Sequence, residues 1–352
     1  IVAIEPSSGE ILALISAPSY NPNLLTGRKR SENYKFLLEN KNKPLFNRAI
    51  QGMYPPGSIF KLINGLIALQ EGTITGRQNY NCYEDKGYSY GKDKYVGCHP
   101  HKYPISLIQA IEVSCNTYFC NIYNKYFSSF NSTIEAYNNW NNHLTSFGIG
   151  NYMKNDFISG SPGMLPKSSY FEKLYKGSWN ANTIISMAIG QGELLLTPIQ
   201  MANISAILAN RGFYYTPHIV KNISEQEAID TNFTKKKFCT IEPKHFEAII
   251  QGMKQVIDGE SGTAKKAKIP GIELCGKTGT AQNPHGEDHS IFISFAPIKN
   301  PKIAIAVYVE NGGRGSTWAA PIASLMTEKY LKKTITNKTQ ESLILNGNLI
   351  TK

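Results

Sequence analysis

Strand-forming runs at both ends of the chain, separated by a long helical middle, constrain its fold most strongly. Residues 1–4 and 11–15 are β-rich runs joined by a turn that contains Pro and Gly, a pattern typical of a hairpin. Three more strand-like runs lie at residues 272–281, 290–296 and 303–310. We expect both groups to join one antiparallel sheet with helices packed on each face, which is an α+β fold.

The middle of the chain contains amphipathic runs and polar connections. Residues 20–50 are typical of a long loop with one short helix, and residues 128–181 of loops with short helices. Residues 73–104 predict an irregular insert, and residues 333–352 a loosely attached polar tail, so the folded body should span residues 1–332. Helices are predicted at residues 58–69, 107–111, after 116, and at 197–208, 243–257 and 321–331.

Composition is that of a folded protein, since 41% of the 352 residues are hydrophobic and 18% are charged. The formal net charge is +11, with Lys and Arg scattered and no nucleic-acid-binding motif. This charge is consistent with a generally basic surface. It is also consistent with a function at a surface of anionic lipid or along an anionic polymer.

The start of the chain carries no targeting signal. No run approaches the roughly 18 apolar residues of a membrane helix, and no signal peptide is present. The chain begins with Ile1 inside a strand-like run rather than with Met. We therefore expect a fragment of a longer protein whose targeting segment lies upstream.

The run Ser58-Ile59-Phe60-Lys61 has the pattern of an activated serine. A lysine three residues along a helix lies on the same face as the serine and can take its proton. The preceding Pro-Pro-Gly indicates that the helix begins at or beside Ser58, where the macrodipole favours a developing alkoxide. Taken alone, the pattern equally fits a serine that caps an ordinary helix.

Two later motifs strengthen this interpretation. Ser114-Cys115-Asn116 follows the Ser58 helix, and Lys277-Thr278-Gly279-Thr280 lies on a late strand-like run. Each alone could be a helix cap or the end of a surface strand. In the order Ser-x-x-Lys, Ser-x-Asn, Lys-Thr-Gly, they form the motif set of penicillin-recognising serine enzymes.

The chain resembles the transpeptidase domain of class B penicillin-binding proteins over roughly residues 1–332. The resemblance includes the first 23 residues, Gly190-Gln191-Gly192 with the Thr197-Pro198 run, Phe295-Ala296-Pro297, and Glu310-Asn311-Gly312-Gly313. Residues 179–201 are most similar to the elongation-type members, penicillin-binding protein 2. The resemblance implies the shared transpeptidase and serine β-lactamase-like fold, with a central antiparallel sheet flanked by helices.

The family's roles, carried onto matching positions, make Ser58 the nucleophile that attacks the penultimate D-alanine and neutral Lys61 its base. Ser114 would relay a proton to the leaving amine, and Asn116 would hold the peptide backbone of the donor. Lys277 would act with the substrate-binding Thr278, Gly279 and Thr280. The charge of Lys277 and the hydroxyls of the two threonines would hold the substrate carboxylate. The backbone N–H groups of Ser58 and Thr280 would form the oxyanion hole.

The insert carries a cluster that suggests a metal site. The resemblance implies structural zinc in this insert, and Cys82, Cys98, His101 and Cys115 would make a Cys₃His set. His99 competes with His101 as the nitrogen ligand, and a Cys82–Cys98 disulfide is the alternative to zinc. We expect the remaining cysteines to pack in the core, namely Cys120, Cys239 and Cys275. No cofactor is expected for the chemistry itself.

The resemblance implies a peptidoglycan D,D-transpeptidase that crosslinks stem peptides during cell-wall elongation and is inhibited covalently by β-lactams. The expected partners are stem peptides, the lipid-linked precursor, a SEDS-family glycosyltransferase and elongation-complex proteins, without nucleic acid. A membrane anchor and a pedestal domain would precede this chain, placing the catalytic domain in the periplasm at the inner membrane. The alternatives are a serine β-lactamase and a β-lactam sensor.

Overall fold

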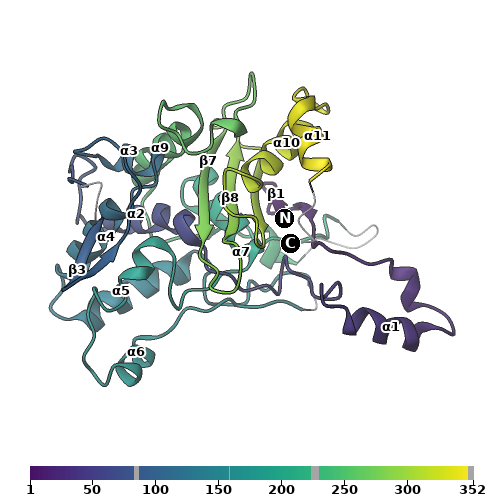
Figure 1. Ribbon diagram of the computed structural model, residues 1–352, viewed down its shortest axis with the longest axis horizontal. Helices are drawn as coiled ribbons and strands as arrows, with labels where there is room; N and C mark the ends of the chain where they lie inside the picture. The colour runs from purple at the N-terminus through teal and green to yellow at the C-terminus, as the bar shows by residue number, and fades with distance from the viewer. Residues whose placement is uncertain (83–86, 158, 223–229, 348–352) are drawn as a thin grey trace.

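The structure is a computed structural model that describes residues 1–82, 87–157, 159–222 and 230–347. Its centre is one antiparallel sheet with strand order β2-β1-β9-β8-β7. The strands are β1 (Val2–Ile4), β2 (Ile11–Leu14), β7 (Cys275–Ala281), β8 (His289–Ala296) and β9 (Ile303–Val309). The predicted α+β fold is confirmed, including the union of strands from both chain ends (Figure 1).

Strand β8 shows why the sheet needs cover on both faces. Every residue from Ser290 to Ala296 is buried, and alternate residues of a strand point to opposite faces. Helices α7 (Pro198–Asn210) and α10 (Ala319–Lys332) both contact β8 and β9, while α9 (Phe246–Asp258) contacts β7. The Ser205 hydroxyl of α7 donates to the Ser294 carbonyl at 2.7 Å, which fixes this helix against the sheet.

The helical middle lies beside the β7 edge of the sheet (Figure 1). Strand β7 is the edge strand that faces this region, so the middle of the chain and the late strand can form two walls of one cleft. The remaining helices are α1 (Arg30–Glu39), α2 (Lys61–Gln70), α3 (Leu107–Glu112), α4 (Asn116–Phe127), α5 (Thr133–Ser146), α6 (Ser168–Leu174), α8 (Thr231–Thr234) and α11 (Lys338–Leu345).

A buried amide ties three of these segments together. Asn64 of α2 donates to the carbonyls of Met187 and Ala188 at 3.2 and 3.0 Å, and accepts from the Trp140 indole of α5 at 2.9 Å. Met187 and Ala188 belong to a 3₁₀ helix, Ile185–Ile189. Because buried polar groups are costly when unpaired, these bonds fix the position of α2 one turn beyond Lys61.

Two segments are more ordered than the sequence predicted. The tail forms α11, which contacts α10. Its Ile344 is half-buried and lines an apolar groove together with Leu325 and Met326 of α10. The insert contains a short hairpin, β3 (Tyr88–Gly91) with β4 (Lys94–Val96), while its residues 83–86 lie outside the described residues. Another two-stranded sheet pairs β5 (Phe213–Tyr214) with β6 (Lys237–Phe238). Within the described ranges, no helix combines the length and apolarity needed to cross a bilayer.

Candidate active site

Ser58 lies in a 3₁₀ turn, Gly57–Phe60, that continues directly into α2. Gly57 has a φ of 58° and donates its N–H to the Gly190 carbonyl at 2.8 Å. A Cβ on Gly57 would lie 2.8 Å from the Thr280 carbonyl oxygen, and a Cβ on Gly190 would overlap the Gly57 carbonyl. This contact of three backbones holds Ser58 next to Thr280 of strand β7.

Lys61 brings the first two motifs together. Its Nζ donates to the Ser114 carbonyl at 2.7 Å, to the Ser114 hydroxyl at 3.2 Å and to Asn116 Oδ1 at 2.5 Å. The side chain is fully buried and has no carboxylate partner among the described residues. Burial lowers the pKa of Lys61 from its ordinary 10.5 to about 8, with nearby cysteines opposing the shift. A large fraction of the amine is therefore neutral near pH 8 and able to accept a proton.

Ser114 is placed by an unusual backbone conformation. It has a φ of 60°, which is uncommon for a residue with a side chain. It follows α3, whose N-terminus has a capping box from Ser106 and Gln109, and precedes α4, which Cys115 caps through the Tyr118 N–H. The two capped helices hold the Ser-x-Asn turn in this conformation against Lys61.

The third motif forms the opposite wall on strand β7. Lys277 is fully buried, and its Nζ donates to the Thr278 carbonyl at 3.1 Å. The pKa of Lys277 lies well below its ordinary value, mainly because the side chain is buried and to a lesser extent because the Lys61 charge repels it. The Thr278 and Thr263 hydroxyls lie 2.9 Å apart, and the Gln191 amide donates to the Thr280 carbonyl at 3.3 Å.

A cavity of about 560 Å³ lies between these walls, a size typical of ligand sites. Of the predicted residues, Ser58, Ser114, Asn116, Thr278 and Thr280 line it. Lys61 and Lys277 are fully buried and lie behind that lining.

Several lining residues were not predicted from the sequence. Gln191 belongs to the quoted Gly-Gln-Gly signature, so its pattern could have identified it. No motif marks Thr263, and none marks Asp288 and Arg314, which come from loops on either side of the strands.

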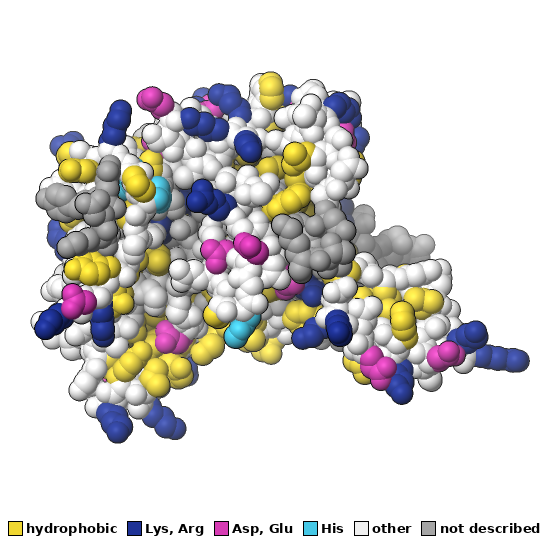
Figure 2. Space-filling view, in the orientation of Figure 1, with side chains coloured by type: hydrophobic (Ala, Val, Ile, Leu, Met, Phe, Trp, Pro, Cys, Tyr) yellow, Lys and Arg dark blue, Asp and Glu magenta, His cyan; other side chains and the backbone are white. Residues whose placement is uncertain are grey.

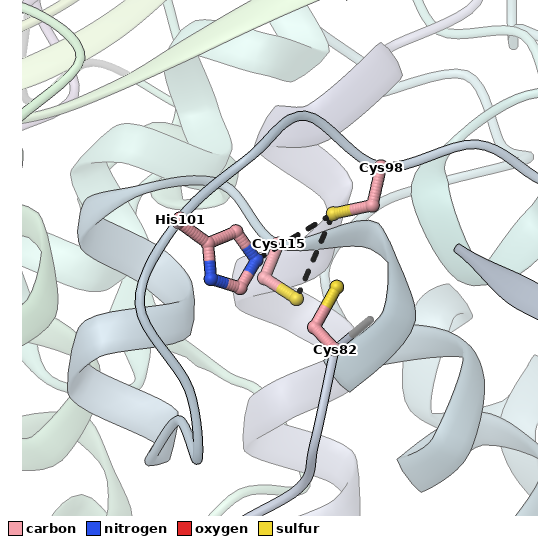
Figure 3. Close-up of side chains that lie close together, drawn as sticks. All are labelled: Cys82, Cys98, His101 and Cys115. Atoms are coloured by element: carbon pink, nitrogen blue, oxygen red, sulfur yellow. Dashed lines mark hydrogen bonds between the residues drawn. The ribbon is translucent and has the colours of Figure 1, made fainter. Parts of the chain in front are cut away.

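The predicted metal cluster is assembled beside the active site. Figure 3 shows Cys82, Cys98, His101 and Cys115 pointing toward one another. Their ligand atoms all lie within 4.8 Å of each other; Cys98 Sγ is 3.8 Å from Cys115 Sγ and 3.7 Å from His101 Nε2. All six cysteines are free thiols, so the alternative Cys82–Cys98 disulfide is not formed.

The surroundings of the cluster favour an anionic sulfur at Cys98. The backbone N–H of Asn116 points at Cys98 Sγ and that of Tyr118 at Cys115 Sγ, both at 3.3 Å. Contact with the Cys115 thiol lowers the pKa of Cys98. The same contact raises the pKa of Cys115, and burial raises the pKa of Cys82. His101 Nδ1 lies 2.9 Å from the Lys102 carbonyl, which leaves Nε2 facing the cysteines.

The neighbouring histidine and the other cysteines have different positions. His99 lines the catalytic cavity, so His101 is the histidine of the cluster. Cys120, Cys239 and Cys275 are buried, as predicted.

Comparison with known proteins identifies relatives along most of the chain. The family model "Penicillin binding protein transpeptidase domain" matches residues 1–328. The peptidoglycan D,D-transpeptidase MrdA of Acinetobacter baumannii is 32% identical over 94% of this chain and 50% of its own length. The PbpA transpeptidase of Mycolicibacterium smegmatis is 31% identical over 92% of this chain and 65% of its own length. The chain thus spans about half the length of MrdA.

Solved structures share the fold. Pseudomonas aeruginosa PBP2 in complex with WCK 5153 superposes with a TM-score of 0.82 and 33% identity, covering 94% of this chain and 73% of that one. The ceftriaxone acyl-enzyme of penicillin-binding protein A from M. tuberculosis has a TM-score of 0.76 and 29% identity, with the same coverage. The Helicobacter pylori complex between PBP2 and MreC has a TM-score of 0.77 and 27% identity, covering 94% of this chain and 59% of that one.

Substituting Gly190 tests the backbone contact that holds Ser58. Gly190→Ala should destabilise the fold for two reasons. Holding alanine in a left-handed backbone conformation costs about 1–2 kcal/mol, and overlap of its Cβ with the Gly57 carbonyl costs about 1–3 kcal/mol more. Gly72→Ala is the matched control, since Gly72 also has a positive φ, 65°, but has nothing within 4 Å of the added Cβ. Urea unfolding should show the larger loss for Gly190→Ala, and equal losses would contradict the contact.

Proposed function

The chain belongs to the penicillin-binding protein transpeptidase family, and we propose that it catalyses D,D-transpeptidation of peptidoglycan stem peptides. The supporting observation is the convergence of Ser58, Ser114 and Thr280 on one cavity, with the buried Lys61 amine hydrogen-bonded to Ser114 behind its wall. We also propose that residues 1–332 form the transpeptidase domain, with the membrane anchor and pedestal domain elsewhere in the whole protein.

In the proposed acylation, neutral Lys61 takes the Ser58 proton while the serine oxygen attacks the carbonyl of the penultimate D-alanine. The developing oxyanion accepts hydrogen bonds from the Ser58 and Thr280 N–H groups, each worth about 3–4 kcal/mol in other acyl-transfer enzymes. Ser114, which lies 3.2 Å from Lys61 Nζ, passes the proton to the nitrogen of the departing D-alanine. The C–N bond breaks and an ester to Ser58 remains.

Substrate binding divides between the two walls. Asn116 contacts the peptide backbone of the donor, and Thr278, Gly279 and Thr280 contact its carboxylate end, with Lys277 supplying charge when protonated. In the second half-reaction an amine from another stem peptide attacks the ester, and Ser58 recovers its proton. A β-lactam imitates the D-alanyl-D-alanine end and leaves Ser58 blocked.

The first experiment tests whether Ser58 is the nucleophile. Ser58→Ala removes the attacking oxygen, so labelling by a fluorescent penicillin should disappear while the melting temperature is retained. Persistent labelling of the variant would remove Ser58 from the mechanism. Wild-type protein should form a stable adduct and turn over nitrocefin slowly, whereas rapid nitrocefin turnover would favour the β-lactamase. Labelling without crosslinking of peptides would favour the sensor.

The reaction should depend on pH through Lys61. The amine is the base only when neutral, and its pKa is about 8, so the second-order rate of penicillin acylation should rise from pH 6.5 to 9 with a midpoint near 8. Lys61→Arg, which cannot lose its proton, should be slower by at least about 100-fold. A rate independent of pH across this range would exclude Lys61 as the base.

We propose that the Cys82, Cys98, His101 and Cys115 cluster holds a structural zinc ion. Ligands at about 2.3 Å around one tetrahedral ion lie about 3.8 Å apart, and the separations of 3.7 and 3.8 Å agree with this spacing. Backbone N–H groups directed at two of the sulfurs suit thiolates. Bound zinc would crosslink the insert to the start of α4, next to the Ser-x-Asn turn.

Metal analysis tests this site. Protein purified without chelators should contain about one zinc per chain, and Cys98→Ser should lose it. Because bound metal stabilises the folded state, chelation should lower the melting temperature by about 5 °C. Cys239→Ser, which removes a buried thiol outside the cluster, should retain the metal. Absence of stoichiometric zinc from the wild-type protein would end the proposal.

We propose an elongation role for the whole protein, with its catalytic domain in the periplasm and its anchor in the inner membrane. The similarity to MrdA and to the PBP2 of the MreC complex supports this assignment. So does the similarity to a peptidoglycan synthase complex that coordinates polymerisation with crosslinking, at a TM-score of 0.80 and 27% identity, covering 95% of this chain and 56% of that one. The corresponding partners are a SEDS-family glycosyltransferase and elongation-complex proteins.

A further inference from the structure

The rim of the Ser58 cavity carries one acidic and one basic side chain that the proposed mechanism does not use. Asp288 comes from the loop between β7 and β8, and Arg314 from the loop between β9 and α10. Figure 2 shows acidic and basic side chains close together over strands β7 and β8. Apart from the imidazole of His99, the other side chains lining the described cavity are neutral hydroxyl, amide or apolar groups.

These two charges are available to a ligand. Neither side chain forms an ion pair with another described residue; the Asp288 carboxylate accepts a long bond, 3.3 Å, from the Asn283 N–H. Arg314 is exposed, and within the described part of the chain its guanidinium donates no hydrogen bond. An arginine and a carboxylate left apart on one cavity can each bind an opposite charge there.

The backbones that carry the two residues are fixed to the sheet. The Gly313 N–H donates to the Asp288 carbonyl at 2.7 Å, and the Ser290 hydroxyl donates to the Arg314 carbonyl at 2.8 Å. A Cβ on Gly315 would overlap the carbonyl oxygens of both strand β8 and strand β7. The two loops are therefore tied to each other and to the strand that carries Thr280, and their backbones require little ordering when a ligand binds.

We propose that Asp288 and Arg314 form an acceptor subsite for an α-amino-acid head group. Asp288 binds the incoming ammonium, and Arg314 binds the carboxylate on the same carbon. This assignment rests on the proposed transpeptidase function, in which the carboxylate end of the donor is already held at Lys277, Thr278 and Thr280. It selects a diamino-dicarboxylic side chain, whose terminal amine has an adjacent carboxylate, over a lysine side chain, whose terminal amine has none.

From this subsite the bound amine attacks the acyl-enzyme, and each proton has a defined acceptor. The ammonium first gives one proton to neutral Lys61, and the free amine attacks the ester carbonyl of acyl-Ser58. The new C–N bond forms as the C–O bond to Ser58 breaks, and the second amine proton goes to the Ser58 oxygen. Lys61 returns its proton to solvent.

A pair of small amines tests the subsite. The full-length protein is acylated with a D-alanyl thioester donor and offered D-methionine or D-methioninamide, which lacks only the negative charge. The ratio of transfer to hydrolysis products, per unprotonated amine, should favour D-methionine by about tenfold, the effect of one charged hydrogen bond. Arg314→Gln should reduce this preference to about twofold or less, and Asp288→Asn should lower transfer to both amines.

Controls separate the subsite from the underlying function. Arg77→Gln, an exposed arginine outside the cavity, should keep the wild-type preference. Labelling of Ser58 by fluorescent penicillin in Arg314→Gln shows that the variant is folded. A wild-type preference below about threefold, or one retained in Arg314→Gln, overturns the subsite while leaving the transpeptidase assignment in place. Failure of the wild-type protein to be acylated by donor and penicillin overturns both.

Discussion

Burial of the Lys61 amine without a carboxylate is the constraint on which the rest of the site depends. Taking an ammonium out of water is costly, and the shift of the Lys61 pKa to about 8 is the direct result. Its oxygen partners all come from the Ser-x-Asn turn, so the amine is stable only when that turn is in place. The first two motifs thus depend on each other, although more than 50 residues separate them in sequence.

The Ser-x-Asn turn in turn depends on the insert. Ser114 has a positive φ, and Cys115 caps α4 through its sulfur. The backbone N–H of Asn116 points at Cys98 Sγ, and its side-chain amide donates to the Gly97 carbonyl at 2.6 Å. The insert is therefore connected to the Lys61 amine through Asn116, which contacts both. Disorder in the insert would therefore be expected to disturb the position of the Lys61 amine.

Patterns that act locally could be predicted from the sequence, and contacts that depend on the assembled fold could not. Strand runs, the Ser58 helix, the three motifs and the four cluster residues each have a composition or spacing with a physical meaning. The α11 helix depends on α10 being present to receive Ile344, which polar composition conceals. Asp288 and Arg314 reach the cavity only because two separate loops are tied to the sheet. The spacing of these residues in the sequence does not predict this arrangement.

The packing of Gly57, Gly190 and the Thr280 backbone has a consequence for how the protein can evolve under antibiotic selection. No side chain fits at either glycine without moving the nucleophile. In the proposed function, a mutation there that excluded a β-lactam would exclude the stem peptide as well, so these positions offer selection no useful variation. The adaptable part of the cavity is its rim, where Gln282 is exposed and a change of side chain leaves the Ser58 geometry intact.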